Sequence, residues 1–476
     1  MLLSIKRLKI LSLAFLSYGA TLNTGYTQTE KDFTPLAYSS VYPESFSENY
    51  REKIQTLVSN EKTLSKKKAY RFYLSLYQSK AQYFSSGQIY FENQLHKYVN
   101  SVAEKLFAKN PSILSKIKIY VSRNTSANAY AMPDGTILIH VGLLARIENE
   151  AQLAAIIAHE TAHVEIQHAV KNISKMENIK SQETNFENDE RDNFRSLKYS
   201  REDEFEADSK AIQYMMNSEY DPSELPKILE IIENENYFKI DKLQENLNKY
   251  LFSDLVTPDT LWFKEDNSES SEKSKSLFGA ENDDLYSTHP DMNKRVSAAK
   301  EILNLIEFKG TDKVKNLMGN QSKEIKNIAL FECIEGMEKD AEYNTGLYLT
   351  LYALEKNPDN LYLKTSIVKN LYWLSFYKEI NCLDKVISNS GRACKENFDL
   401  FNTFLTKIPH NELKKLMFTY TKKNLESCQT KDDFFFYYGL GSEMYLGKDP
   451  SKLIFNQYLL KFPSGKFITT AKAKIQ

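Results

Sequence analysis

The sequence predicts a mainly α-helical protein with a small β-sheet, followed by an all-α C-terminal domain that resembles helical repeats. Gly and Pro are scarce, at 15 and 12 of 476 residues, which favours helices over glycine-punctuated β architecture. Apolar residues recur at helical spacing in many segments, and two short segments look like strands. The length predicts two to four domains, since a domain commonly holds roughly 100–200 residues.

The charge balance excludes one large class of partners. Lys and Arg together number 62 and Asp and Glu 63, which leaves a formal charge of −1 at pH 7. Sequence-independent binding to nucleic acid depends on a basic excess, and this chain has none. We therefore expect no nucleic-acid partner.

The N-terminus has the layout of a secretory signal peptide. Basic residues at positions 6, 7 and 9 precede the apolar run Ile10–Leu16, and small residues follow, which predicts a signal peptide over residues 1–25 cleaved near Gly19 or Ala20. A short buried helix or an uncleaved anchor is the alternative. No Cys follows the run and no other segment approaches 18 uncharged apolar residues, so we expect neither a lipid anchor nor an integral membrane span after cleavage. The expected location is the periplasm or cell envelope, with the protein soluble or peripherally associated with the outer membrane.

Changes in composition divide the rest of the chain into four parts. Residues 26–85 form a polar, Tyr-rich helical segment, residues 86–308 a mixed α and β part, residues 309–324 a linker and residues 325–476 the helical C-terminal domain.

The cysteines of the chain all lie in the C-terminal domain. An oxidising compartment would permit one or two disulfides among them, and free thiols in a helical core are the alternative. The cysteines concerned are Cys333, Cys382, Cys394 and Cys428.

The mixed part begins with a helix within residues 91–108. Two short strands follow at 117–121 and 136–141, and the turn-like stretch Ala131-Met-Pro-Asp-Gly135 precedes the second, so we expect neighbouring strands. In the C-terminal domain the turn Asn357-Pro-Asp-Asn360 separates two helical stretches, as is typical of paired-helix repeats. No clean 34-residue period is evident, so a non-repeating helical domain stays open.

The next helix is the best-specified element in the sequence. Asn149 caps it, Gln152 can complete a capping box, and the apolar pattern predicts a helix from about 150 to 170. Two polar, charge-rich excursions come later. Residues 171–199 are predicted to be a mobile excursion with one helix, and residues 263–284 a flexible loop. Helices are also expected at 198–217 and from Ser287-Thr-His-Pro290 through Leu305.

The helix after Asn149 carries His159-Glu-Thr-Ala-His163. The i, i+4 spacing puts both imidazoles on one face, one turn apart, where both can reach a single Zn²⁺. Seven His in the whole chain make a chance occurrence improbable. Two ordinary histidines on a helix are the alternative interpretation.

A catalytic zinc site needs a third protein ligand and one open position. The extended pattern with a third His is excluded, because Ile166 and Ala169 stand where its Gly and His would be. A downstream helix offers Glu202, Glu204 and Glu206. Only Glu204 has an Asp one turn later, so we assign Glu204 as the ligand and Asp208 as the carboxylate that orients a ligand His. A solvated acidic helix face is the alternative.

These roles predict peptide-bond hydrolysis. Zn²⁺ lowers the pKa of water toward about 7 and polarises the scissile carbonyl, while Glu160 accepts the proton of the water and delivers it to the leaving amine.

Several motifs together resemble the M48 family of zinc metallopeptidases over residues 80–305. They are Asn128-Ala-Tyr-Ala-Met-Pro-Asp-Gly135, Gly142-Leu-Leu144, Asn149-Glu150, His159-Glu-Thr-Ala-His163, Ser200-Arg201 with Glu204-Phe-Glu-Ala-Asp208, and Ser287-Thr-His-Pro290 with Arg295. Within the family, the chain looks closest to the periplasmic branch, because it has an export signal, no predicted membrane helices and a helical tail. That branch carries a tetratricopeptide-like tail and acts in outer-membrane protein assembly and quality control. The resemblance implies a zincin-type α+β peptidase domain over residues 86–308.

The resemblance also implies roles for individual residues. His159, His163 and Glu204 would hold one zinc ion per chain, and Glu160 would be the catalytic base. His289 and Arg295 would lie at the active site, where His289 either stabilises the tetrahedral intermediate or occupies the fourth zinc position and keeps the enzyme latent. The strand of Thr136, Ile137, Leu138 and Ile139 would form the sheet edge on which an extended substrate pairs, a mode that tolerates many side chains.

Two functions remain in competition at this point. The first is an exported zinc endopeptidase that acts on misfolded or unassembled envelope proteins. The second is a largely latent, chaperone-like factor whose helical C-terminal domain docks an envelope assembly partner or client protein. A purely structural zinc protein fits poorly, because three ligands leave the site open.

Overall fold

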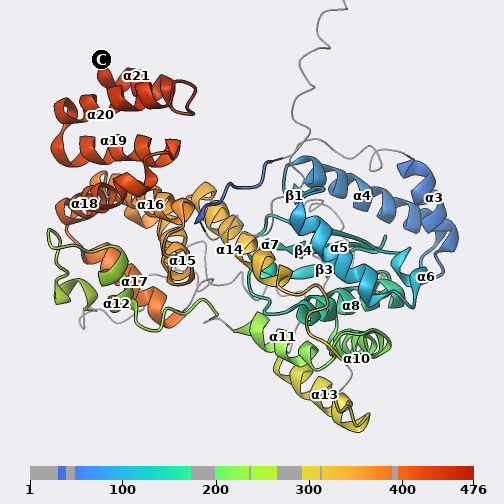
Figure 1. Cartoon of the computed structure of the whole chain (residues 1–476). Helices are drawn as coiled ribbons and strands as arrows, with labels where there is room; N and C mark the ends of the chain where they lie inside the picture. Colours follow the sequence, from blue (N-terminus) through green and yellow to red (C-terminus); the bar gives the residue numbers. More distant parts are fainter. Residues whose placement is uncertain are drawn as a thin grey trace, which may run out of the picture.

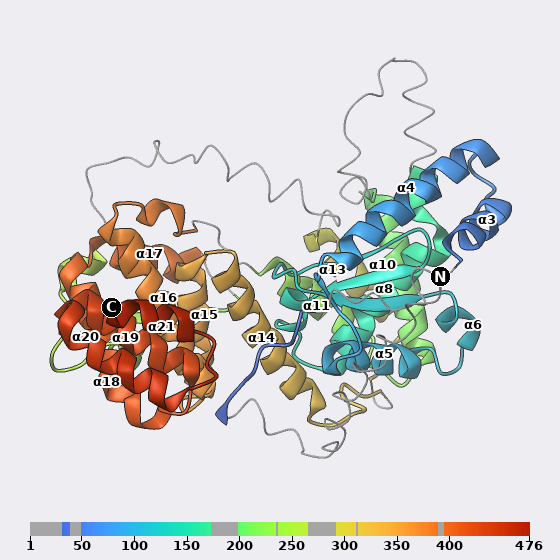
Figure 2. The same cartoon turned by 90° about the horizontal axis from the view of Figure 1, so that it is seen from above.

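The computed structural model describes residues 31–38, 49–172, 199–234, 237–264, 292–310, 313–388 and 395–476. The signal peptide predicted over residues 1–25, most of the excursions at 171–199 and 263–284, Cys394 and His289 lie outside these residues. In the described part the protein is mainly α-helical with one four-stranded sheet, as the sequence predicts. Figures 1 and 2 show a lobe that contains the sheet and a lobe of C-terminal helices, with α14 (Gln321–Lys339) running between them.

The helical segment expected at residues 26–85 contains two helices in its described part. They are α3 (Tyr50–Asn60) and α4 (Lys66–Ser85), and α4 buries Tyr73, Leu76 and Phe84 in a small core that reaches Leu138 of the sheet. The buried Lys80 side chain contacts Asp134, which secures α4 to the turn before the last strand.

The sheet has the strand order β1-β2-β4-β3. Its strands are β1 (Ile89–Tyr90), β2 (Lys118–Ser122), β3 (Ala129–Ala131) and β4 (Thr136–His140). The two predicted strands, β2 and β4, are parallel neighbours, with Tyr120 opposite Leu138.

One expectation about the sheet is wrong. The strand of Thr136, Ile137, Leu138 and Ile139 is not a sheet edge, because β3 pairs with it antiparallel on the side away from β2. The turn after Ala131 folds the chain back on itself, and Gly135 adopts φ +86 there, so the three residues of β3 cover the backbone of β4. The outer strand on this side is β3.

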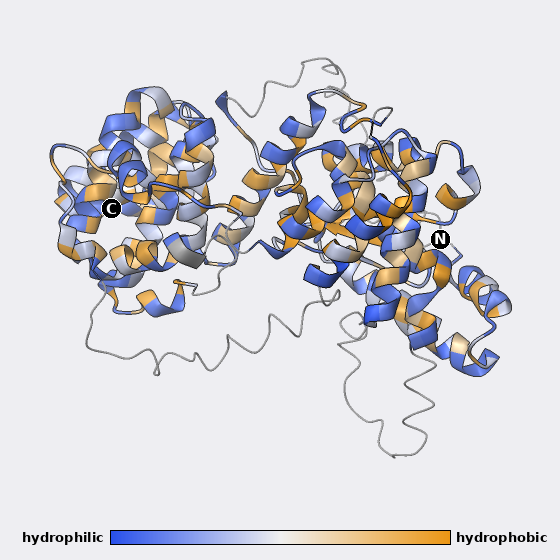
Figure 3. Ribbon diagram, turned by 90° about the horizontal axis from the view of Figure 1, so that it is seen from below, coloured by the Kyte–Doolittle hydropathy of each residue, from blue (hydrophilic) through white to orange (hydrophobic). Residues whose placement is uncertain are grey.

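The helix α8 (Glu150–Ile166) passes through the centre of the sheet-containing lobe. Nearly all its side chains as far as His163 are buried, since it packs against α5 (Gln94–Leu106), α10 (Arg201–Asn217), α11 (Glu224–Glu233) and the strands β3 and β4. Figure 3 shows the hydrophobic segments gathered in this region. The short helices α6 (Pro111–Leu114) and α7 (Val141–Leu144) and the later α13 (Met292–Leu305) complete the lobe.

The helix α8 differs from the sequence-based prediction in its capping at the start and in the residue at which it ends. Asn149 caps the helix, and its side chain accepts a hydrogen bond from the Gln152 backbone N–H at 3.0 Å. The Gln152 side chain accepts from the Glu148 N–H instead of completing a capping box. The helix ends at Ile166 instead of near residue 170, because Gln167 adopts a left-handed conformation (φ 59) and helical backbone resumes only at 168.

The C-terminal lobe is a succession of packed helices. Neighbours in the sequence pack on one another from α14 to α16 and again from α18 to α21, and the turn at 357–360 joins α15 to α16 as predicted. After α14 they are α15 (Tyr343–Lys356), α16 (Leu361–Glu379), α17 (Lys395–Lys407), α18 (His410–Cys428), α19 (Asp432–Leu446), α20 (Lys448–Lys461) and α21 (Ile468–Ile475), with the short η3 (Leu383–Lys385) after α16. Cys333, Cys382 and Cys428 are free thiols, and the first and last are buried in the helical core.

One segment of the predicted 86–308 part lies against the C-terminal helices. It contains α12 (Leu243–Tyr250) and η2 (Thr260–Phe263), and the ring of Phe263 stacks on Phe404 with 5.3 Å between centroids. Asn246 also donates a hydrogen bond to Glu355 at 2.9 Å. In the described part of the chain, no helix is both long and apolar enough to cross a membrane.

Candidate metal centre

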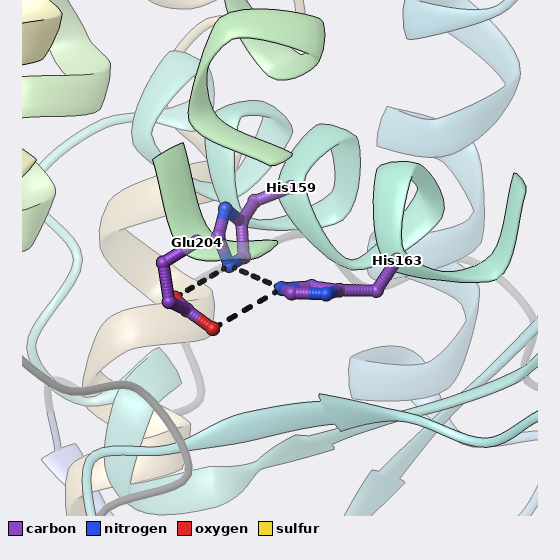
Figure 4. A group of neighbouring side chains, drawn as sticks. All are labelled: His159, His163 and Glu204. Atoms are coloured by element: carbon purple, nitrogen blue, oxygen red, sulfur yellow. Dashed lines mark hydrogen bonds and ion pairs between the residues drawn. The ribbon is translucent and has the colours of Figure 1, made fainter. Parts of the chain in front are cut away.

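Three predicted ligands meet between α8 and α10. His159 and His163 project from one face of α8, and their Nε2 atoms lie 3.0 Å apart. The carboxylate of Glu204, in the first turn of α10, faces both rings, with 3.5 Å from His159 Nε2 to Oε2 and 3.5 Å from His163 Nε2 to Oε1. Figure 4 shows the three side chains pointing toward one another, and all three are buried.

The geometry of this group fits a tetrahedral zinc ion. Zinc binds imidazole nitrogen at about 2.0–2.1 Å, so two ligand atoms of a tetrahedral site are separated by roughly 3.3 Å. The observed separations of 3.0, 3.5 and 3.5 Å bracket that value. Two His and one Glu form the donor set of a catalytic zinc site, with a fourth position left for water or substrate.

The local sequence sets the position of Glu204. Ser200 and Asp203 form a capping box, in which the Ser200 hydroxyl accepts from the Asp203 N–H and the Asp203 carboxylate accepts from the Ser200 N–H. This cap starts α10 at Arg201 and places Glu204 and Asp208 one turn apart on the face toward α8.

Asp208 lies behind His159, on the side of the ring away from the other two candidate ligands. Its Oδ1 lies 2.9 Å from His159 Nδ1, which leaves Nε2 of that ring facing the other ligands. Burial and the nearby Arg295 both lower the pKa of His159, but the hydrogen bonds to Asp208 and Glu204 together with the negative charge of Asp208 outweigh them and raise it to about 9. Burial raises the pKa of Asp208, but the charges and hydrogen bonds of Arg295 and His159 together outweigh this effect and bring the net pKa below its ordinary value.

Arg295 is brought to the site from α13. It is almost completely buried, and its guanidinium contacts Glu204 Oε2 at 2.7 Å and both oxygens of Asp208. These contacts make Arg295 a residue that positions the carboxylates. Glu160 is also buried, on α8 beside the ligands, and its charge contributes to raising the pKa of Arg295.

The structure adds two residues to the site that the sequence analysis missed. The ring of Tyr199 stacks on His163 at 3.7 Å between centroids, and its hydroxyl donates to the Ala131 carbonyl of β3 at 3.2 Å. His168 Nδ1 lies 2.8 Å from His163 Nδ1. On a straight helix a residue five positions after His163 points elsewhere. Only the backbone turn at Gln167 brings His168 back, and the sequence carries no clear signal for that turn.

The fold and this site define a metallopeptidase domain. Comparison with known families bears this out, since residues 91–303 match the family described as peptidase family M48. The match covers less than half of the chain, and over these residues the chain is similar to that family.

Individual relatives match over short segments. The chain is 26% identical over 95 residues to the beta-barrel assembly-enhancing protease of Yersinia pestis, a match that covers 20% of each chain. It is 31% identical over 77 residues to the protein of the same name from Escherichia coli (strain K12), covering 16% of each. It is also 32% identical over 77 residues to the mitochondrial metalloendopeptidase OMA1 of Schizosaccharomyces pombe, covering 16% of this chain and 23% of that one. The matched segments therefore span less than a quarter of each relative.

Proposed function

We propose that this protein is an exported, zinc-dependent metalloendopeptidase that hydrolyses peptide bonds in misfolded or unassembled envelope proteins. The observation that carries the proposal is the convergence of His159, His163 and Glu204, with Glu160 on the same helix. A structural zinc site would need a fourth protein ligand and would have no use for a buried carboxylate beside it. The proposed domain limits are 86–308 for the peptidase, 309–324 for a linker and 325–476 for the helical domain.

Each residue has a distinct part in the proposed reaction. His159, His163 and Glu204 would hold the zinc ion, which when bound supplies Lewis-acid polarisation of the scissile carbonyl and a lowered pKa of water. Glu160 accepts a proton from the attacking water and delivers it to the departing amine. Asp208 and Arg295 keep the His159 ring and the Glu204 carboxylate in place. His289 lies outside the described residues, and its role at the fourth position stays a sequence-based prediction.

The substrate class and location rest on the names of relatives and on the sequence. Two matched relatives are named as proteases that enhance β-barrel assembly, and the N-terminus has the layout of a signal peptide. The C-terminal helices add a surface for a client or an assembly partner. On that surface Leu453 and Leu460 of α20 are 65% and 83% exposed. This exposure keeps a chaperone-like binding factor as the second candidate function.

Cleavage of an unfolded protein tests the proposal. The purified, zinc-loaded chain is incubated with reduced casein beside Glu160→Gln, His289→Ala and Glu202→Gln, the last an exposed glutamate of α10 that serves as control. We expect cleavage by the wild type and by Glu202→Gln and none by Glu160→Gln. Cleavage by His289→Ala alone would show a peptidase kept latent at its fourth zinc position. No cleavage by any of the four would overturn the peptidase in favour of the binding factor.

A further inference from the structure

His168 lies directly behind one of the ligands. It is completely buried, and its two ring nitrogens face different partners. Nδ1 is 2.8 Å from His163 Nδ1, and Nε2 is 3.1 Å from Glu206 Oε2 and 3.7 Å from Asp203 Oδ1. A chain of contacts therefore runs from Nδ1 of His163, the ring nitrogen that does not face the other ligands, through a second imidazole to carboxylates of α10.

For neutral imidazoles, hydrogen-bond chemistry allows two proton arrangements along this chain. A 2.8 Å contact between two ring nitrogens needs one proton, which either His163 or His168 supplies. If His163 supplies it, His163 Nε2 carries a lone pair toward Glu204 and His159. If a neutral His168 supplies the proton, the Nε2 atom of His168 has only a lone pair to face the carboxylate oxygens. A neutral His163 then carries its own proton on Nε2, and a protonated Nε2 cannot bind a metal.

The carboxylates select between these arrangements. A carboxylate accepts hydrogen bonds and cannot donate them when ionised, so Glu206 favours the tautomer in which His168 carries its proton on Nε2. His168 Nδ1 is then an acceptor, and His163 must donate from Nδ1. The Tyr199 ring, which stacks on the His163 ring, restrains the plane of His163 but does not distinguish its two tautomers.

We propose that His168, oriented by Glu206, is a positioning residue that holds His163 in the tautomer whose Nε2 binds the metal. It does for His163 what Asp208 does for His159, through an imidazole in place of a direct carboxylate contact. The left-handed turn at Gln167 serves this arrangement, because it ends α8 and returns the next residue toward His163. The inference rests on the proposed function, since it requires a metal ion at His159, His163 and Glu204.

The test measures zinc affinity by competition with a chromogenic chelator, together with the visible spectrum of the Co²⁺-substituted chain. Asn at position 168 can present its Oδ1 close to where the Nδ1 acceptor was, whereas Leu presents no acceptor. Loss of such an outer contact typically weakens metal affinity by about 10–100-fold. We expect a loss in that range for His168→Leu with an altered Co²⁺ spectrum, and affinity within about threefold of the wild type for His168→Asn. Equal losses in the two variants, or no loss in His168→Leu, would overturn the inference.

A second pair of variants keeps the test decisive if His168→Leu does not fold. Glu206→Gln removes the charge that orients His168, and we expect zinc affinity to fall severalfold, while Glu202→Gln, the exposed glutamate one turn earlier, binds as the wild type does. Wild-type affinity in Glu206→Gln would contradict the inference. A wild-type chain that binds no zinc would instead refute the proposed function itself, so the two failures are distinct.

Discussion

Arg295 donates hydrogen bonds to both carboxylate oxygens of Asp208 in a bidentate ion pair. The distances are 2.8 Å from Nε to Oδ2 and 2.7 Å from Nη2 to Oδ1, and the same Oδ1 faces His159 Nδ1. The planar guanidinium matches a carboxylate in this way, whereas a lysine offers only a point charge. Because Arg295 belongs to α13 and Asp208 to α10, this pair links the last helix of the M48 match to the helices that carry the ligands.

Replacing Arg295 by Met should destabilise the metal-free protein strongly. The change leaves Glu204 and Asp208 as buried carboxylates without their cation, and breaking a buried pair on one side commonly costs about 3–5 kcal/mol. Urea unfolding measures the loss, which should be smaller with zinc bound because the ion compensates part of the charge. Lys300→Met on the same helix removes an exposed pair with Glu230 and should cost at most about 1 kcal/mol. Equal losses in the two variants would contradict this expectation.

Stability should depend on pH through His140. Burial lowers the pKa of this imidazole from 6.5 to about 4. Between those values the unfolded chain binds a proton that the folded chain does not, so stability falls as the pH falls from 6.5 to 4, by up to about 3 kcal/mol. Above pH 6.5 the group has no effect. Unfolding curves of the wild type and His140→Asn should therefore diverge by that amount between pH 7 and pH 4, and parallel pH profiles would refute the prediction.

Two glycines near Thr125, the buried Gly142 and the half-buried Gly336, should respond differently to the same substitution. A Cβ on Gly142 would lie 1.9 Å from the Thr125 backbone oxygen, which cannot move without shifting the strand connection. A Cβ on Gly336 of α14 would meet only the Thr125 side-chain methyl, at 3.0 Å. We expect Gly142→Ala to cost about 3 kcal/mol or more and Gly336→Ala to be nearly neutral, since helix propensity favours Ala by about 1 kcal/mol. Thermal unfolding of the two variants checks this, and similar melting temperatures would contradict it.

Removal of the metal should abolish activity and lower the melting temperature together. An ion that binds only the folded state stabilises it by mass action, and about 2.7 kcal/mol is expected at 100 times the dissociation constant. Dialysis against a chelator, followed by stoichiometric Zn²⁺, should remove and restore both properties. Glu160→Gln should show the same zinc-dependent rise in melting temperature without activity, because Glu160 is not a ligand. A variant that gains no stability from zinc would show that Glu160 helps to hold the ion.

Much of the fold and the ligand set follow from local sequence patterns. The i, i+4 spacing of His159 and His163 places them on one face of any α-helix, and the Asn149 cap begins α8 where the sequence predicts. The helix expected from residue 198 begins at Arg201. Glu204 and Asp208 likewise share a face because they are one turn apart. Helix geometry is set by neighbouring residues, so such relations are visible without the tertiary fold.

Only the tertiary structure decided three other features. The strand β4 is internal because β3 pairs with it. His168 contacts His163 because the backbone turns at Gln167. Arg295 contacts Asp208 although it lies 87 positions later in the chain, on another helix. Each depends on the pairing of backbone or side chains that no local period or cap encodes, and is fixed only when the whole core packs. The sequence alone thus determined the candidate metal ligands, and packing determined which groups contact them.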